Sequence, residues 1–312
     1  MELSIVTSMY YSAPYLKEFY NRIKKSVEKI TLDYEIIFVN DGSPDDSLDK
    51  AISLYEKDDR VKVIDLSRNF GHHKAMMTGL AHAKGELVFL IDCDLEEEPE
   101  LVGKFYNKLK NSDADVVYGV QETRKGSFLE RINATFFYVL FNMLSSHPLP
   151  KNIMTVRLMS DKYVGNLVEH RERETIIAGL WVITGFRQVP FIVKKLDKGS
   201  TTYNFSRKIS NLVNGITSFS SKPLVLIFYL GSAIVFISSI SALYLIVRRV
   251  FFGDLLIGWP SLIVSIWLLG GLIMFCLGVI GIYLSKIFME TKQRPYTVIR
   301  KIYDKASLNN LQ

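Results

Sequence analysis

Along the first 120 residues, short continuous apolar runs alternate with segments whose apolar residues recur at helical spacing. This pattern predicts alternating strands and helices. Short apolar runs predict strands at 3–7, 34–39, 61–66, 87–91 and 114–119. Apolar positions at helical spacing predict helices over 15–30, 45–56 and 74–83. Because strand, helix and strand recur in this order, the sequence predicts an α/β fold with a mostly parallel sheet and right-handed crossovers.

The strand predicted at 87–91, LVFLI, ends abruptly in the acidic sequence DCDLEEEPE. Its apolar run has no helical period, which is typical of a central strand buried on both faces. Ligands of open α/β sheets bind beyond the carboxyl ends of strands, so we expect the oxygens of Asp92, Asp94 and Glu96 to converge there along an extended backbone. Such hard ligands suit Mg²⁺ or Mn²⁺ carrying a phosphorylated substrate. In the alternative interpretation, the acids only cap a helix that begins near Pro99.

A second acidic strand end lies in the sequence NDGSPDD. Asp41, which precedes a tight turn, can accept hydrogen bonds from the base or the ribose of a nucleotide. The structural alternative, an Asx-turn with a helix N-cap, accounts better for Ser43 and Asp45. Because acidic strand ends would meet at one edge of the sheet, a functional role is favoured for Asp41.

A strand-to-helix turn follows in the sequence SRNFGHHKA. At Arg68, Asn69 and Gly71, backbone N–H groups of such a turn face an anion. His72 and His73 are interpreted as surface or helix-start residues. A zinc site is not indicated, because no cysteine or spaced third histidine accompanies them.

Basic side chains bracket a further turn, in QETRKGSFLER, ahead of an aromatic segment. Arg124, Lys125 and Arg131 could clasp a phosphate there, and a lipid phosphate entering from a bilayer surface would suit the neighbouring aromatic residues. In the alternative, these charges are solvated and the aromatic residues pack on the sheet. The functional interpretation is favoured for the arginines, and Lys125 is left open between the two.

Two long segments near the C-terminus, 224–247 and 260–284, carry no charged residue. Each exceeds the roughly 20 residues that cross a bilayer core, so both are predicted to span a membrane as a hairpin. Basic residues concentrate before the first span and after the second, which predicts that both termini are cytoplasmic. Small residues on the second span favour close helix packing and a homo-oligomer such as a tetramer.

Four regions follow from this pattern. They are a cytoplasmic catalytic domain at 1–204, an interfacial amphipathic helix at 205–222, a transmembrane hairpin at 223–285 and a basic cytoplasmic tail at 286–312. With 312 residues, 48% hydrophobic content and a formal charge of +6, the chain has room for one large soluble domain and such an anchor. No signal peptide is predicted, and Cys93 and Cys276 lie in such different surroundings that no disulfide is expected.

A series of motifs resembles the polyisoprenyl-phosphate glycosyltransferases of the dolichol-phosphate mannose synthase type. The motifs are SIVTSMYYSA, NDGSPDD, SRNFGHHKA, DCDLEEEPE, an R-x₆-R pair, VRLMS, GITSFSSKPL and ETKQRP. Among these enzymes the bacterial bactoprenol glucosyltransferase branch, with its C-terminal two-span hairpin, is the most similar. The resemblance covers nearly the whole chain in the family's order, and it implies a GT-A glycosyltransferase fold.

The resemblance also implies roles for individual residues. Those assigned to the donor nucleotide are Asp41, Asp92, Asn69 and Gly71. Asp94 and Glu96 would hold Mg²⁺ or Mn²⁺ on the donor diphosphate. Those assigned to the acceptor phosphate are Arg124, Lys125, Arg131 and Arg157, and the three arginines would act with Asp94 in catalysis. The chain departs from the family's usual pattern at TSMYYS, Glu96, Asn152 and Thr202.

The implied activity is inverting transfer of a sugar from a nucleotide-diphosphate sugar, expected to be a UDP-sugar, to polyprenyl phosphate at the inner membrane, for modification of cell-envelope glycans. A lipid phosphate is already anionic near neutral pH, so positioning and charge would carry catalysis without a strong general base, and no nucleic acid partner is expected. One alternative is another transferase of the same fold, although a processive synthase would carry Q-x-x-R-W, which the sequence lacks. The other is a non-catalytic lipid-sugar binder or translocation partner that retains the fold.

Overall fold

The computed structural model describes residues 1–121, 152–170, 177–194, 213, 217, 220–252 and 258–305. The chain divides into two compact units. The first joins Met1–Tyr138 and Leu149–Tyr203 with Arg294–Gln312, and the second consists of Val139–Pro148 and Asn204–Gln293. The first unit therefore contains both the N-terminal and the C-terminal segments of the chain.

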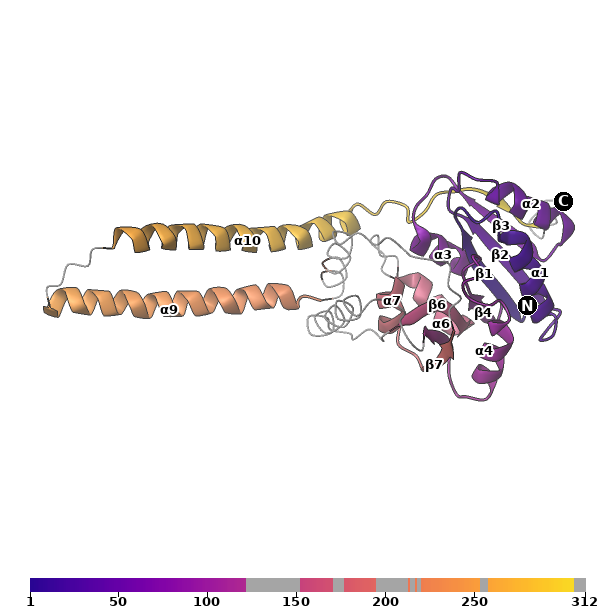
Figure 1. The fold of residues 1–312 in the computed structure, drawn as a ribbon, viewed down its shortest axis with the longest axis horizontal. Helices are drawn as coiled ribbons and strands as arrows, with labels where there is room; N and C mark the ends of the chain where they lie inside the picture. Colours follow the sequence, from indigo (N-terminus) through magenta and orange to yellow (C-terminus); the bar gives the residue numbers. More distant parts are fainter. Residues whose placement is uncertain are drawn as a thin grey trace. The chain divides into compact units, whose positions relative to one another are not determined.

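A mixed sheet forms the centre of the first unit (Figure 1). Its strands are β1 (Leu3–Met9), β2 (Tyr34–Asn40), β3 (Val61–Leu66), β4 (Leu87–Leu90), β5 (Val116–Gln121), β6 (Ile153–Ser160), β7 (Gln188–Val193) and β8 (Ile299–Tyr303). They lie in the order β7-β5-β6-β4-β1-β2-β3-β8. The pairs β1–β2, β1–β4, β2–β3 and β5–β7 are parallel, while β3–β8, β4–β6 and β5–β6 are antiparallel. The predicted α/β class is confirmed, with the parallel strands at the centre.

Helices cover the sheet and bury its central strands. The helices of this unit are α1 (Leu16–Val27), α2 (Ser47–Lys57), α3 (His72–Ala81), α4 (Leu101–Lys110), α6 (Asp161–Glu169) and α7 (Ile177–Ile183). The apolar face of α1 shows why they pack as they do, because Leu16, Phe19, Ile23 and Val27 recur at helical spacing and are all buried. α1 contacts α2 and α4, and α3 contacts α6. The strands and helices predicted in the first 120 residues agree with these elements to within a few residues at each end.

The strand β8 was not anticipated from the sequence. Residues 286–312 were expected to form a basic tail, whereas Ile299–Tyr303 pairs antiparallel with β3 at one edge of the sheet. Figure 1 shows this segment, in yellow, beside the indigo N-terminal strands. Lys62 of β3 forms ion pairs with Glu35, at 2.7 Å, and with Asp304, at 3.2 Å, so a largely buried charge network also anchors the C-terminal segment. Residues 299–304 are therefore an integral part of the first unit.

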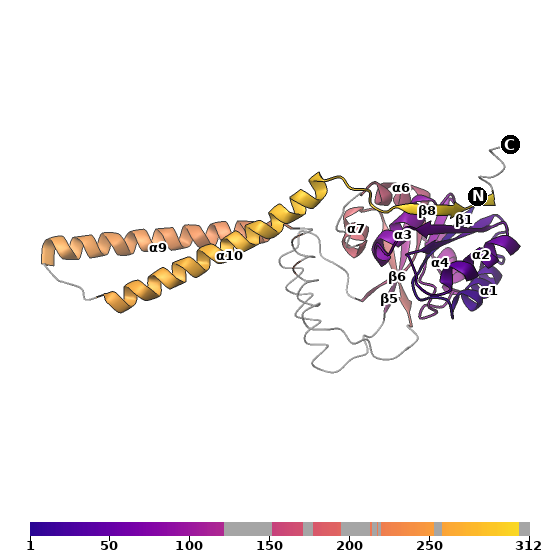
Figure 2. The same ribbon diagram turned by 90° about the horizontal axis from the view of Figure 1, so that it is seen from above.

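Two long helices, α9 (Lys222–Phe252) and α10 (Trp259–Thr291), form most of the second unit. They contact each other, run side by side in Figure 1 and cross each other in the view of Figure 2. The predicted spans 224–247 and 260–284 fall within these helices. Large apolar side chains on them, Phe228 and Trp267 among them, are exposed.

Within the described part of this unit, one stretch, Ser265–Thr291, is long and apolar enough to cross a membrane. Lys222–Ile234 forms a shorter apolar helix. The interfacial helix predicted at 205–222 falls almost wholly outside the described residues, so it stays a prediction.

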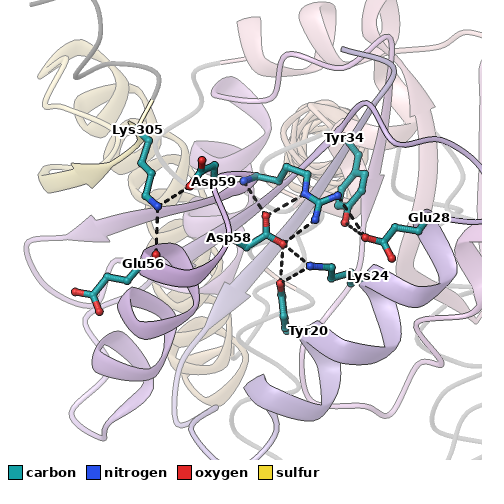
Figure 3. A network of polar contacts seen from close by, with 9 residues as sticks. Tyr20, Lys24, Glu28, Tyr34, Glu56, Asp58, Asp59 and Lys305 are labelled. Atoms are coloured by element: carbon teal, nitrogen blue, oxygen red, sulfur yellow. Dashed lines mark hydrogen bonds and ion pairs between the residues drawn. The ribbon is translucent and has the colours of Figure 1, made fainter.

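A polar network surrounds Asp58, at the amino end of β3 (Figure 3). The carboxylate accepts hydrogen bonds from Tyr20 Oη at 2.7 Å, from Lys24 Nζ at 2.7 Å and from Arg60 Nε at 3.0 Å. Burial alone would raise the pKa of Asp58, but these hydrogen bonds outweigh it and hold the pKa well below its usual range. The network joins α1 to the start of β3.

We expect Asp58→Asn to lower the free energy of unfolding by about 2 kcal/mol at pH 7, because charge-assisted hydrogen bonds are lost. The folded-state pKa is depressed, so this stabilisation is complete above the unfolded-state pKa of about 4 and is lost as the pH falls below it. Thermal unfolding at pH 7 and at pH 3 would show a gap between the two proteins that narrows in acid. Asp59→Asn is the matched control, because Asp59 is exposed and pairs only with Lys305 among the ion pairs of the described residues. A gap that is independent of pH would contradict the account.

Candidate functional site

The carboxyl ends of β1, β2, β3 and β4 meet at one edge of the sheet, because these strands are parallel and adjacent. Four pieces of chain gather there. They are the end of β1 at Ser8, the turn at Asp41 after β2, the β3–α3 loop (residues 67–71) and the acidic loop (residues 92–98) that follows β4. The predicted site residues on these pieces are Asp41, Asn69, Gly71, Asp92, Asp94 and Glu96.

Asp41 holds the β3–α3 loop in place. Its Oδ1 accepts a hydrogen bond from Phe70 N at 2.7 Å, and its Oδ2 accepts one from Gly71 N at 3.0 Å. The side chain is buried, which raises the pKa of Asp41, while the two N–H groups act in the opposite direction. Asp41 therefore shapes this edge of the sheet, and any contact with a nucleotide would use the remaining lone pairs of its oxygens.

Glycine is favoured at two points of this edge, at Gly42 by a close backbone approach and at Gly71 by its backbone conformation alone. Gly42 has a φ of 62°, and a Cβ there would lie 2.5 Å from the backbone of Arg68 and Asn69. Gly71, with a φ of 100°, precedes the first turn of α3. The backbones of the two segments are thus packed directly together at Gly42.

His72 links two strand ends, a role that the sequence did not reveal. Its Nδ1 lies 2.8 Å from Ser8 Oγ at the end of β1, and its Nε2 lies 3.3 Å from Asp92 Oδ1 after β4. The histidine starts α3 as predicted, but it also faces the site. No sequence spacing could signal this contact, since it joins residues from three separate elements.

The acidic loop forms a turn rather than the extended segment that was expected. Leu95 adopts a left-handed conformation with a φ of 64°, and Asp94 Oδ1 accepts a hydrogen bond from Glu96 N at 2.9 Å. Alternation of side chains along a strand therefore does not describe Asp92, Asp94 and Glu96. The hydrogen bond from Glu96 N to Asp94 Oδ1 closes an Asx-turn, and this turn sets the direction of the acidic side chains.

A divalent cation is compatible with this loop on chemical grounds. Across the residues that the structure describes, no three His, Cys, Asp or Glu side chains are grouped so that they could hold a metal ion. Mg²⁺, however, is usually bound by one or two carboxylates together with substrate phosphates and water. Asp94 and Glu96 are both partly exposed at the sheet edge, so their hard oxygens fit such a shared site.

Arg157 lies in the core and not on a surface. The side chain is fully buried and stacks on Trp181, while its Nε and Nη2 donate to the carbonyl oxygens of Thr155 and Met154, each at 3.2 Å. Burial lowers the pKa of Arg157 to about 9, although the nearby Glu97 carboxylate raises it. The guanidinium is closed off from solvent in this structure, and the predicted contact between Arg157 and the acceptor phosphate stays a prediction.

Glu97 is the buried member of the acidic loop, and the sequence analysis did not single it out. Its Oε1 accepts a hydrogen bond from Val156 N at 3.4 Å. Val156 and Arg157 are neighbours on β6, which pairs with β4. Glu97 thus links the acidic loop to β6, and its carboxylate is near enough to the Arg157 guanidinium to raise the pKa of Arg157.

Comparison with known proteins identifies the family. The profile of Glycosyl transferase family 2 matches residues 4–172, which include β2 to β6 and all of β1 except Leu3. The chain belongs to glycosyl transferase family 2. A Mycobacterium tuberculosis protein named as a glycosyltransferase is 59% identical over 97% of this chain and 89% of its own length. The prophage bactoprenol glucosyl transferase homolog of Escherichia coli is 32% identical over 97% of this chain and 99% of its own length.

Among solved structures, mannosyl-3-phosphoglycerate synthase from Rubrobacter xylanophilus is similar with a TM-score of 0.49 and 17% identity, covering 70% of this chain and 73% of that one. Membership of glycosyl transferase family 2 and the mixed sheet with its parallel centre confirm the predicted GT-A class. The resemblance found in the sequence motifs is confirmed as well.

Part of the predicted site lies outside the residues that the structure describes. Arg124, Lys125 and Arg131, the residues assigned to the acceptor phosphate, lie outside the described residues, and so does Thr202. Asn152 is described and has a φ of 56° at the start of β6, a conformation that asparagine tolerates better than most residues. This change from the usual family residue therefore coincides with a left-handed backbone position.

Proposed function

We propose that this glycosyl transferase moves a sugar from a nucleotide-diphosphate sugar, most simply a UDP-sugar, to polyprenyl phosphate, forming a polyprenyl-monophosphate sugar. The observation that carries the proposal is the 32% identity to a bactoprenol glucosyl transferase homolog across 97% of this chain, α9 and α10 included. The gathering of Asp41, His72 and the acidic loop at one edge of the sheet supports it.

The donor would bind at that edge. Asp41 and Asp92 would contact the nucleoside, and the N–H groups of the β3–α3 loop around Asn69 and Gly71 would face the diphosphate. Asp94 and Glu96 would hold Mg²⁺ or Mn²⁺ on the diphosphate, where a bound cation offsets the charge of the leaving group. His72 would keep Asp92 aligned with the end of β1 through its contact with Ser8.

The acceptor would be held by cations. Phosphate would be bound by the planar guanidinium groups of Arg124 and Arg131 and by the ammonium group of Lys125. A phosphate monoanion or dianion needs no proton removed before it attacks, so these residues have only to aim its oxygen at the anomeric carbon of the sugar. Attack from the face opposite the leaving group inverts that centre, and an α-linked donor gives a β-linked product. Arg157 would assist indirectly, through Glu97 and the acidic loop.

The second unit would place the enzyme at the inner membrane. We infer that α9 and α10 cross the bilayer as a hairpin with both termini in the cytoplasm, in line with their exposed apolar side chains and the basic residues that flank them. Small residues along α10, including Gly270, Gly271 and Gly278, offer a surface for close packing in a homo-oligomer.

A transfer assay tests the proposal. Full-length protein in liposomes with undecaprenyl phosphate and Mg²⁺ would be given a panel of radiolabelled nucleotide sugars. We expect label in the lipid fraction with at least one donor, and release of one nucleoside diphosphate for each sugar transferred. Donor binding without any release of nucleoside diphosphate would favour the non-catalytic binder and overturn the proposal.

A further inference from the structure

We propose that Arg300, on the C-terminal strand, is a positioning residue for the donor nucleotide. It holds the β3–α3 loop in the shape that binds the nucleotide sugar. This inference rests on the proposed function, because that loop carries Asn69 and Gly71. It assigns a part in donor binding to a segment that follows the apolar helices in the chain and lies outside the residues matched by the family 2 profile.

A β-bulge places Arg300 where it can act. In the pairing of β3 with β8, Asp65 lies opposite Lys301 and Leu66 lies opposite Ile299, so Arg300 is the extra residue between them. A bulge of this kind bends the strand and redirects the side chain of the inserted residue, and bulges are frequent beside active sites. The side chain of Arg300 therefore does not follow the regular alternation of side chains along β8, and it lies at the carboxyl end of β3.

The Arg300 guanidinium contacts two groups at the end of β3 and the start of the β3–α3 loop. Nη2 donates to the carbonyl oxygen of Ser67 at 2.7 Å, and Nη1 lies 3.3 Å from Asp65 Oδ2. The backbone of Ser67 is also held from its other side, since Ser67 N donates to Val298 O at 2.8 Å. Both main-chain polar groups of the first loop residue are thus engaged by the C-terminal segment.

The same contacts continue to the residues at the site. Asp65 Oδ1 accepts a hydrogen bond from Asn40 Nδ2 at 2.8 Å, and Asn40 directly precedes Asp41. Asp41 in turn binds the N–H groups of Phe70 and Gly71. The β3–α3 loop is therefore held at both ends. Asp41 binds its last residues, Phe70 and Gly71, and Arg300 binds its first residue, Ser67. Asp65 contacts both Arg300 and Asn40, the residue before Asp41.

Helix α3, which begins directly after the loop, is attached to the same segment. Thr78 Oγ1 lies 2.9 Å from Thr297 Oγ1, and Lys74 Nζ lies over the ring of Tyr296 at 5.7 Å. Loop and helix are thus both tied to residues 296–300. Loss of the Arg300 contact would free the outer end of the loop while the sheet pairing of β8 remains.

The opposite end of the C-terminal segment supplies a matched control. Lys305 pairs with Asp59 at 2.6 Å and donates to Glu56 O at 3.2 Å (Figure 3). Among the described residues, Lys305 and Arg300 each make one ion pair and one hydrogen bond to a backbone carbonyl, and Lys305 also lies over the Tyr55 ring at 5.4 Å. Lys305 makes these contacts at the amino end of β3, away from the site. Substitution of Lys305 therefore tests loss of an attachment of the segment, whereas substitution of Arg300 also tests loss of the contact that positions the loop.

The test measures binding of UDP with Mg²⁺ to the full-length protein in detergent by calorimetry. We expect Arg300→Ala to raise the Kd about tenfold, Arg300→Lys to fall between this variant and the unmodified protein, and Lys305→Ala to stay within about twofold. Hydrogen exchange at the amides of Phe70 and Gly71 should accelerate in Arg300→Ala and not in Lys305→Ala.

Equal changes in Kd for Arg300→Ala and Lys305→Ala, or no change in either, would overturn the positioning role. If UDP binding depends on Arg300 as expected but the unmodified protein transfers no sugar to lipid, the proposed function fails and the positioning role stands. Absence of any nucleotide binding by the unmodified protein would overturn both.

Discussion

Asp94→Asn is expected to lower kcat/KM for sugar transfer by at least about 10³-fold, a loss of about 4 kcal/mol of transition-state stabilisation. The substitution keeps the shape of the side chain and its hydrogen bond to Glu96 N, but removes the charge that would hold the cation. The loss should therefore fall on catalysis and on metal-supported donor binding. Glu96→Gln should be milder, because an oxygen ligand remains.

The measurement compares initial rates and UDP affinity with and without Mg²⁺ for each variant. Glu98→Gln is the control from the same loop, since Glu98 pairs with Lys104 at only 3.9 Å and both side chains are exposed. We expect Asp94→Asn to abolish the gain in UDP affinity that Mg²⁺ provides, and Glu98→Gln to retain it. Turnover by Asp94→Asn at the unmodified rate would refute the role of this carboxylate.

Arg157→Met is expected to destabilise the first unit by about 3 kcal/mol, because it leaves the buried Glu97 carboxylate without its neighbouring cation. Met retains much of the apolar volume, so the loss reports the missing charge more than a cavity. Thermal unfolding of the full-length protein measures it. Arg187→Ala, which breaks an ion pair with the 97% exposed Asp113, should change stability by less than about 0.5 kcal/mol.

A double-mutant cycle separates the charge coupling from general damage to the core. Glu97→Gln alone should also destabilise, since it removes the negative charge that acts on buried Arg157. Combined with Arg157→Met, the loss should be smaller than the sum of the two single losses. Strict additivity would show that the two charges do not interact, and Arg157 would then have no route to the acidic loop through Glu97.

Local patterns accounted for most of the first unit. The runs LSIVT, YEIIFV and VKVIDL became central parallel strands, because short and mostly apolar runs without a helical period are typical of strands buried on both faces. The placement of Asp41 and Asp92 at one sheet edge followed from parallel topology alone. These expectations depended on short-range spacing, which a single sequence records well.

Contacts between distant segments were not predictable in this way. The strand IRKIY is short, charged and separated from β3 by more than two hundred residues, so nothing in its own pattern marks it as a strand of this sheet. The contact between His72 and Asp92, and the burial of Arg157 against Trp181, likewise arise only when separate elements pack. The turn at Leu95 was missed because its φ of 64° breaks the extended pattern assumed for alternating acids.

Mass spectrometry of the lipid product tests the central claim most directly. Full-length protein, undecaprenyl phosphate and a nucleotide sugar accepted in the transfer assay would be incubated with Mg²⁺, and the lipid and nucleotide products analysed together. The account predicts a polyprenyl lipid that carries one phosphate and one sugar, with an equal amount of nucleoside diphosphate. A lipid with two phosphates and release of nucleoside monophosphate, or donor consumption without any lipid product, would contradict it.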